Sequence, residues 1–214
     1  MQKALNAAGR DPGEAAAIVE RRGVTRRGEL VGELLIYHEA KRLYEGLVLC
    51  GIMELESDLA TLCTQKALVH STAADGHGAL QEYEQAIAIW ERLVKQEARR
   101  ELADSLAGAY MNKAIVVCNL DDNQGAMTLY DKSIKIWDRM VSQEGHSELA
   151  NSLASAYMNK AISVRALGDN CGAIELYDQA ISIWERMVNQ EGRHDLSNDL
   201  ERAYRNKSIA VKCQ

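Results

Sequence analysis

Apolar residues recur every three or four positions through most of this chain, which is the spacing of one face of an α-helix. Two consecutive stretches, 149–167 and 171–191, each carry one such apolar stripe. Between them, Gly168 can adopt the left-handed conformation that ends a helix, and Asp169 or Asn170 can cap the next one. Because so short a turn brings the second helix back antiparallel to the first, the pattern predicts a helical hairpin.

The hairpin pattern repeats with a period of 47 residues. Segments 101–147 and 148–194 align without a gap and are identical at 31 of 47 positions, and a more distant copy spans 54–100. Such a fixed period indicates a stacked repeat architecture. We therefore divide the chain into a degenerate N-terminal repeat or cap (1–53), three repeats (54–100, 101–147, 148–194) and a C-terminal half-repeat or capping helix (195–214).

The irregular ends and the joints between repeats give further expectations. Residues 11–22 predict a short helix, and residues 29–49 predict a longer one that resembles the second helix of a repeat. Ser147 and Asp195 are expected to cap the first helices that follow them. The tryptophans keep the 47-residue spacing on the apolar stripe of the second helices, so we expect core packing for Trp90, Trp137 and Trp184.

The amino-acid composition and the absence of known motifs argue against several classes of function. The chain has one proline and no phenylalanine, which favours an all-α fold, and its net charge of −6 argues against nucleic acid or an anionic membrane as the main partner. No apolar run is long enough to span a bilayer. The five cysteines form no CxxC pair, so we expect free thiols and a cytoplasmic location. No nucleotide-binding or HExxH motif occurs, and we expect no metal, no cofactor and no enzymatic activity.

The order Tyr157-x3-Ala161, Gly168-Asp169, Ala173-x3-Tyr177-x2-Ala180 resembles the tetratricopeptide repeat. The likeness covers roughly residues 54–214. The repeat is longer than the usual one of about 34 residues, which makes it similar to the long-helix repeats of the kinesin light chain kind. The resemblance implies an all-α, right-handed superhelical solenoid of antiparallel helix hairpins, with a concave groove lined mainly by the first helices.

Carried onto this sequence, the resemblance predicts the residues of a peptide-binding groove. A recurring pair, an amide beside an apolar residue, lies off the core stripe. The amide can both donate and accept hydrogen bonds, but it could equally bond between adjacent repeats and only fix their stacking. The predicted groove residues are Gln65, Met111, Asn112, Ile115, Asn119, Met158, Asn159, Ile162, Arg165, Arg205, Asn206, Ile209 and Lys212.

A lysine departs from the family pattern just before the small alanine of each first helix, at Lys66, Lys113, Lys160 and Lys207. Lys160 lies inside the apolar stripe, where a buried ammonium needs a partner or must reach solvent. We expect ion pairs with second-helix carboxylates, for which the candidates are Glu84, Asp131 and Asp178. A basic seam for an acidic peptide is the other interpretation.

These features predict a non-catalytic interaction module or scaffold that binds a peptide or protein segment in its groove. The alternative is a structural role, as a self-assembling solenoid or a sensor fragment of a larger regulatory protein. Under that alternative the terminal repeats could form a homodimer, because Ile209, Ala210 and Val211 would leave an apolar face open.

Overall fold

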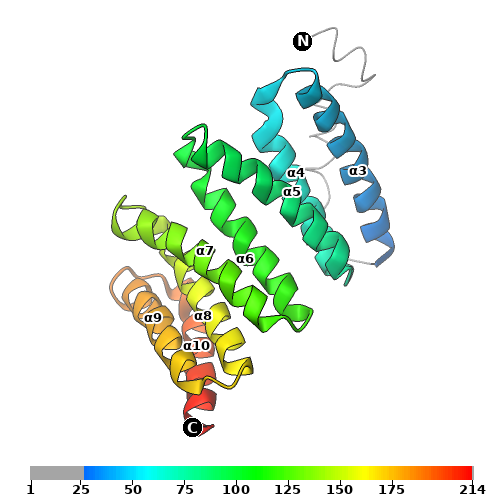
Figure 1. The fold of residues 1–214 in the computed structure, drawn as a ribbon. Helices are drawn as coiled ribbons and strands as arrows, with labels where there is room; N and C mark the ends of the chain where they lie inside the picture. Colours follow the sequence, from blue (N-terminus) through cyan, green and yellow to red (C-terminus); the bar gives the residue numbers. More distant parts are fainter. Residues whose placement is uncertain (1–26, 214) are drawn as a thin grey trace. The chain divides into compact units, whose positions relative to one another are not determined.

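The computed structural model describes residues 27–213, with side chains described from Gly32 onward (Figure 1). Every regular element in this range is helical, and the short helix predicted over residues 11–22 lies outside it. The α-helices are α3 (Arg27–Leu49), α4 (Glu56–Thr72), α5 (Gly76–Lys95), α6 (Ala103–Asn119), α7 (Asn123–Ser142), α8 (Ala150–Ala166), α9 (Asn170–Asn189) and α10 (Ser197–Lys212).

The chain divides into two compact units, residues 1–102 and 103–214. The described part of the first unit contains α3, α4 and α5, with α3 packed on α4 and α4 packed on α5. In the second unit α6 pairs with α7, α8 pairs with α9, and α10 packs on α9. The predicted class, an all-α solenoid of antiparallel helix hairpins, is confirmed.

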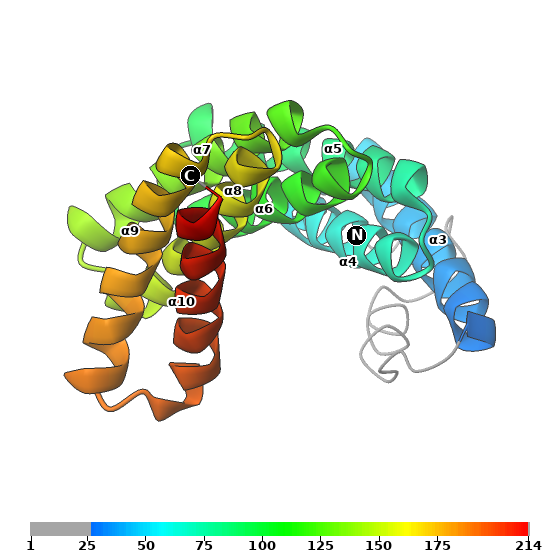
Figure 2. The same cartoon turned by 90° about the horizontal axis from the view of Figure 1, so that it is seen from below.

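Within the second unit the helices form two layers. The first helices α6, α8 and α10 are neighbours in one layer, and the second helices α7 and α9 form the other (Figure 2). α7 packs on α8 as well as on α6, so each second helix joins its own hairpin to the next. Two adjacent hairpins therefore share a core, as expected for a repeat that buries its apolar face against its neighbours.

The turn inside each hairpin has the predicted chemistry. Asp169 caps α9 by accepting a hydrogen bond from the Gly172 backbone N–H at 2.8 Å. Asp75 and Asp122 cap α5 and α7 in the same way. Gly168 takes a φ of +90°, which a residue without a Cβ adopts at little cost. The expected helix end and N-cap are confirmed.

The expected caps of the first helices are wrong. A 3-10 turn precedes each of them, at Met53–Leu55, Arg100–Leu102, Ser147–Leu149 and His194–Leu196. This turn moves the capping position to Leu149 before α8 and to Leu196 before α10, and neither residue makes a side-chain cap. Asp195 instead binds the guanidinium of Arg193 at 2.9 Å.

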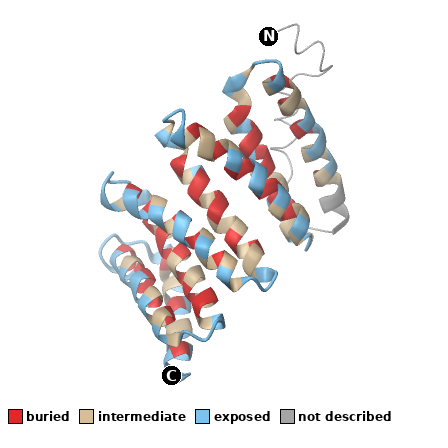
Figure 3. Cartoon of the chain, in the orientation of Figure 1, coloured by how far each residue is buried: buried red, intermediate tan, exposed pale blue. Residues whose placement is uncertain are grey.

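The three tryptophans lie in the core, as predicted. Trp90, Trp137 and Trp184 are at most 3% exposed, and buried positions follow the sides of the helices that face one another (Figure 3). The indole N–H of Trp184 donates to Asn151 at 2.8 Å, and that of Trp137 donates to Asp104 at 2.7 Å. Each bond ties a second helix to the start of its own first helix, which satisfies a donor that burial would otherwise leave unpaired.

Candidate functional site

Two rows of matching side chains cross the first helices of the second unit. Each of α6, α8 and α10 carries an asparagine and, three residues later, an isoleucine, so the two side chains are neighbours on one helix face. All six are at least partly exposed, and Ile209 is 41% exposed. We call this surface the Asn–Ile face; its residues are Asn112, Ile115, Asn159, Ile162, Asn206 and Ile209.

The asparagines of this face are not used to fix the stacking of the described repeats. Other amides have clear bonds: Asn151 accepts from Trp184, and Asn170 donates to the Cys213 carbonyl at 2.9 Å. Between residues 27 and 213, the structure records no side-chain hydrogen bond for Asn112, Asn159 or Asn206. Their amides are therefore available to a ligand.

Met158 does not belong to the exposed surface. Its side chain is 2% exposed and lies in a core cluster with Ala203 and Ala210 of α10. The neighbouring first helix covers it, so it offers no surface to a ligand and we remove it from the candidate face. Met111 is half-buried and packs against the cluster of Ala114, Ala126 and Tyr130, as Ile115 also does.

Two of the predicted basic residues lie beside the Asn–Ile face. Arg165 is three residues after Ile162 and Lys212 is three residues after Ile209, so each is a neighbour of that isoleucine on the helix surface. Arg165 is half-buried and its Nε atom has no partner among the described groups. Burial raises the pKa of the neighbouring Tyr177, and the positive charge of Arg165 opposes that rise. Arg205 is exposed on α10, and Asn119 is exposed at the end of α6.

In the first unit, α4 carries the equivalent positions with different residues. Gln65 and Thr64 are half-buried, and Leu68 is 46% exposed. Gln65 has the same donor and acceptor groups as asparagine on a longer side chain. The amide and apolar chemistry is therefore present on this helix as well.

The expected pairing of the lysines is confirmed where the second unit shows it. Lys160 of α8 lies 2.5 Å from Asp131 of α7, and Lys207 of α10 lies 2.5 Å from Asp178 of α9. In each pair the carboxylate comes from the second helix of the preceding repeat. These ammonium groups already have a counter-charge, which weakens the interpretation as a basic seam for an acidic peptide.

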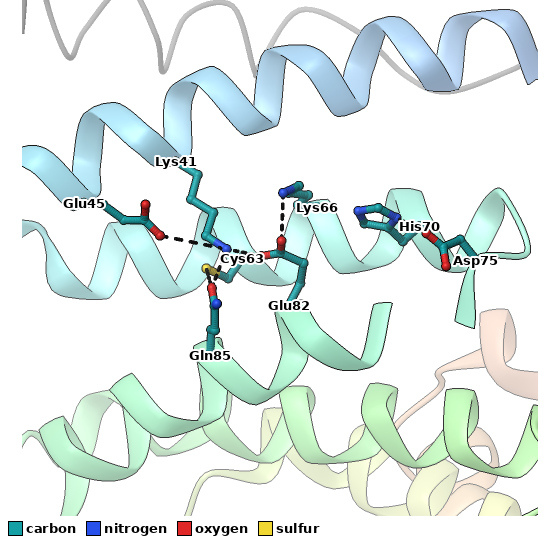
Figure 4. A network of polar contacts seen from close by, with 8 residues as sticks. All are labelled: Lys41, Glu45, Cys63, Lys66, His70, Asp75, Glu82 and Gln85. Carbon is teal, nitrogen blue, oxygen red and sulfur yellow. Dashed lines mark hydrogen bonds and ion pairs between the residues drawn. The ribbon is translucent and has the colours of Figure 1, made fainter. Parts of the chain in front are cut away.

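Lys66 has a partner that the sequence did not suggest. Its ammonium lies 2.8 Å from one oxygen of Glu82, and the Lys41 ammonium lies 2.6 Å from the other (Figure 4). Lys41 also contacts the side-chain oxygen of Gln85 and lies 4.0 Å from Glu45. The three helices of this unit thus meet at a buried carboxylate held by two lysines.

The contacts of this network shift the pKa values of Glu82 and Cys63. Burial disfavours the charged form of Glu82, but the hydrogen bonds and charges of Lys41 and Lys66 outweigh it and hold its pKa below the ordinary value. Burial raises the pKa of the adjacent Cys63 thiol to about 12, although Lys41 opposes this. A thiol that stays protonated is a poor nucleophile, so the cluster has the chemistry of a structural joint.

Residues 27–213 hold no cluster of three or more metal-ligating side chains. They also hold no helix that is both long and apolar enough to cross a bilayer.

The comparisons with known proteins agree on the repeat. The sequence model of the tetratricopeptide repeat matches residues 153–195, and none of the curated proteins matches the chain. The fold is similar to BtubC (BKLC) from P. vanneervenii, at 20% identity and a TM-score of 0.60 over 99% of this chain and 83% of that one.

Two other solved structures share the fold. The putative kinesin light chain TPR-like repeats of Podosopora anserina are 16% identical with a TM-score of 0.61, over 98% of this chain and 90% of that one. The MamA protein is 14% identical with a TM-score of 0.51, over 100% and 89%. One repeat of this chain, at 153–195, therefore matches the tetratricopeptide repeat, and the fold of the chain is similar to that of solved TPR-like repeats.

Proposed function

We propose that the Asn–Ile face of the second unit binds an extended segment of a protein partner. The observation that carries the proposal is the threefold recurrence of a half-exposed amide without a recorded side-chain bond, beside an isoleucine, on adjacent first helices. The tetratricopeptide fold is generally a protein-interaction scaffold, which supports a protein as the ligand class.

The chemistry of the asparagine row suits a peptide backbone. Each amide can donate to a peptide carbonyl and accept from a peptide N–H. Packed helices lie about 8–10 Å apart, and an extended chain advances about 3.3–3.6 Å per residue. One asparagine is therefore available to about every third residue of a segment that crosses α6, α8 and α10.

The isoleucine row adds side-chain selectivity. Ile115, Ile162 and Ile209 lie beside the asparagines with the same repeat. A segment in the polyproline II conformation, which repeats every three residues, would place every third side chain against this row. We propose that the bound segment carries apolar residues at that spacing.

The proposed module is non-catalytic and cytoplasmic. Its face consists of amides and aliphatic groups, which bind without supplying a general acid, a base or a nucleophile. A homodimer through the terminal repeats is the second candidate, and the exposure of Tyr204 (45%) and Val211 (49%) on α10 is the observation in its favour. A further role as a sensor within a larger protein remains compatible with either candidate.

The test is capture of partners by the wild type and by the triple variant Asn112→Ala, Asn159→Ala, Asn206→Ala, followed by mass spectrometry. The matched control removes three exposed amides from the layer of second helices, in the variant Gln124→Ala, Gln179→Ala, Asn189→Ala. We expect the specific partners to be lost by the first variant and kept by the control. If the triple asparagine variant keeps the helicity of wild type and captures the same partners as the control variant does, the proposal is contradicted.

A further inference from the structure

The buried acidic and basic side chains of this protein are concentrated in one of its two units. Among the described residues they all belong to the first unit, and they are Glu33, Lys41, Glu56 and Glu82. In residues 103–213 the buried polar side chains are Ser133 and Ser163, which are neutral. The helices of the first unit are therefore joined partly by buried ion pairs, whereas the described core of the second unit contains no such pair.

Glu82 joins the three helices of the first unit. Its carboxylate lies 2.6 Å from the Lys41 ammonium of α3 and 2.8 Å from the Lys66 ammonium of α4, so it ties both helices to α5 (Figure 4). The other titratable groups beside this network are the Cys63 thiol of α4 and Glu45 of α3, which lies 4.0 Å from Lys41. Glu45 is 45% exposed and more distant, which makes it a weak substitute for Glu82.

A second buried carboxylate joins α4 to α5. Glu56, in the first turn of α4, contacts the guanidinium of Arg92 in the last turn of α5. The hydrogen bond to Glu56 raises the pKa of Arg92. In the second unit the position of Glu56 is held by alanine, in Ala103 and Ala150, and both are buried. The repeats thus show that this position can be filled without a charge.

Acid affects the two units differently. Burial disfavours the charged form of Glu82, but Lys41 and Lys66 hold its pKa below the ordinary value of 4.5. Its stabilising contribution is therefore complete above about pH 4.5 and is lost as the pH falls further. Protonation removes the negative charge that both nearly buried ammonium groups contact, which is unfavourable. Leu129 and Leu176 stand at the equivalent position of the second unit and do not titrate.

The second unit also has carboxyl groups with a lowered pKa, but they lie at the surface. Hydrogen bonds from its own backbone N–H and from His146 lower the pKa of Glu148, and the hydrogen bond from Arg193 lowers that of Asp195. Both carboxyl groups are exposed and belong to the 3-10 turns before α8 and α10. Solvent screens such contacts, so their protonation releases a local pair and leaves the core intact.

We propose that acid opens the first unit, with loss of packing among α3, α4 and α5, while the second unit remains folded. The chain then contains an acid-sensitive part and an acid-resistant part, and the Asn–Ile face lies in the resistant part. This inference stands on the distribution of buried carboxylates alone. It holds whether or not the proposed peptide binding does.

The experiment is amide hydrogen exchange on the full chain, read by mass spectrometry at several pH values between about 5.5 and 3.5. The buffer contains about 0.3 M salt, which screens the repulsion between exposed cations. Each rate is divided by the intrinsic exchange rate at that pH. We expect the protection of α4 and α5 to fall by about tenfold more than that of α8 and α9. Equal loss in both units, no loss in either, or earlier loss in α8 and α9 would overturn the proposal.

Two variants show whether the buried carboxylates cause the difference. Lys41→Ile, Glu56→Ala, Lys66→Met, Glu82→Leu replaces them and their lysines by apolar side chains, and it should remove the selective response. The matched control Asp131→Asn removes an exposed carboxylate of the second unit and should respond as wild type does. If the apolar variant is as helical as wild type at pH 7 and still loses protection selectively in α4 and α5, the proposal is overturned.

Discussion

The ammonium of Lys160 lies 2.5 Å from the carboxylate of Asp131 and joins α8 to the second helix of the preceding repeat. Lys207 and Asp178 make the same pair one repeat later. This relationship accounts for the lysine that departs from the family pattern. Its stem can lie along the apolar stripe while its ammonium reaches a carboxylate at the edge of the core.

The Lys160–Asp131 pair should contribute little to stability. The side chain of Asp131 is 59% exposed, so water and salt screen the attraction, and exposed pairs are worth about 0–1 kcal/mol. We expect Asp131→Asn to lower the unfolding free energy by no more than about 1 kcal/mol. Urea denaturation checks this value, and a loss of more than about 2 kcal/mol would show that the pair is far more important than its exposure suggests.

The buried carboxylate of the first unit should behave differently. Glu82 is held by Lys41 and Lys66, and all three side chains are at most 11% exposed. Glu82→Gln removes the carboxylate that both ammonium groups contact, and it leaves Lys41 only Glu45 at 4.0 Å. We expect a loss of about 3–5 kcal/mol in unfolding free energy, as for other broken buried ion pairs. Chemical denaturation followed by circular dichroism measures it.

A compensated variant provides the control for that loss. Leu129 and Leu176 stand at the position of Glu82 in the other repeats, and Ile87 aligns with Lys41. The variant Lys41→Ile, Glu82→Leu, Lys66→Met replaces the whole network by apolar side chains of similar size. Its stability should return to within about 1 kcal/mol of wild type. Loss as large as in Glu82→Gln would mean that packing, rather than charge, causes the effect.

The contribution of Glu82 should depend on pH with a definite sign. Its pKa is lowered in the folded protein from the ordinary value of 4.5. The unfolded chain therefore takes up the proton first as the pH falls, and stability declines below about pH 4.5. We expect the difference in unfolding free energy between wild type and Glu82→Gln to be constant from pH 7 to 5.5 and to shrink below 4.5. A difference that grows on acidification would contradict this.

The N-cap of α9 gives a prediction in the second unit. Asp169 accepts the Gly172 N–H at 2.8 Å. Asp169→Ala should cost about 1 kcal/mol of stability, whereas Asp169→Asn keeps an oxygen acceptor and should change it by only a few tenths. Thermal melts of the two variants compare the effects. Equal melting temperatures for both would show that the cap does not stabilise the helix.

Local pattern was enough to predict most of the hairpin. The stripes over 149–167 and 171–191 correspond to α8 at Ala150–Ala166 and α9 at Asn170–Asn189, because burial against one neighbour imposes the 3.6-residue period. The cap at Asp169 was also predictable, since its acceptor and its donor are three residues apart. The 3-10 turn before each first helix was not predicted, because neither Ser147 nor Asp195 signals it by composition.

The sequence pattern did not predict which distant segments contact one another. Lys66 pairs with Glu82 and not with a residue of α3. In later repeats the lysine pairs with Asp131 or Asp178, but the aligned residue of α3 is His38, which has no carboxylate. Met158 was placed in the groove by family register, but the following first helix covers it. In both cases the result depends on which helix is the neighbour, and a single-helix pattern does not contain that information.

The recurrence of the asparagines can be tested one repeat at a time. An uncharged hydrogen bond contributes about 1 kcal/mol, which corresponds to about a fivefold change in Kd. If a captured segment crosses the Asn–Ile face, Asn112→Ala, Asn159→Ala and Asn206→Ala should each weaken binding by about this factor. The three effects should be similar because the repeats present the same amide.

The most direct measurement is isothermal titration of the captured partner segment into wild type and into the triple asparagine variant. The account predicts an affinity weaker by about a hundredfold in the triple variant, from three lost bonds of about 1 kcal/mol each, with no loss in the Gln124, Gln179, Asn189 control. An unchanged Kd for a triple variant that retains the helicity of wild type would contradict binding at the Asn–Ile face.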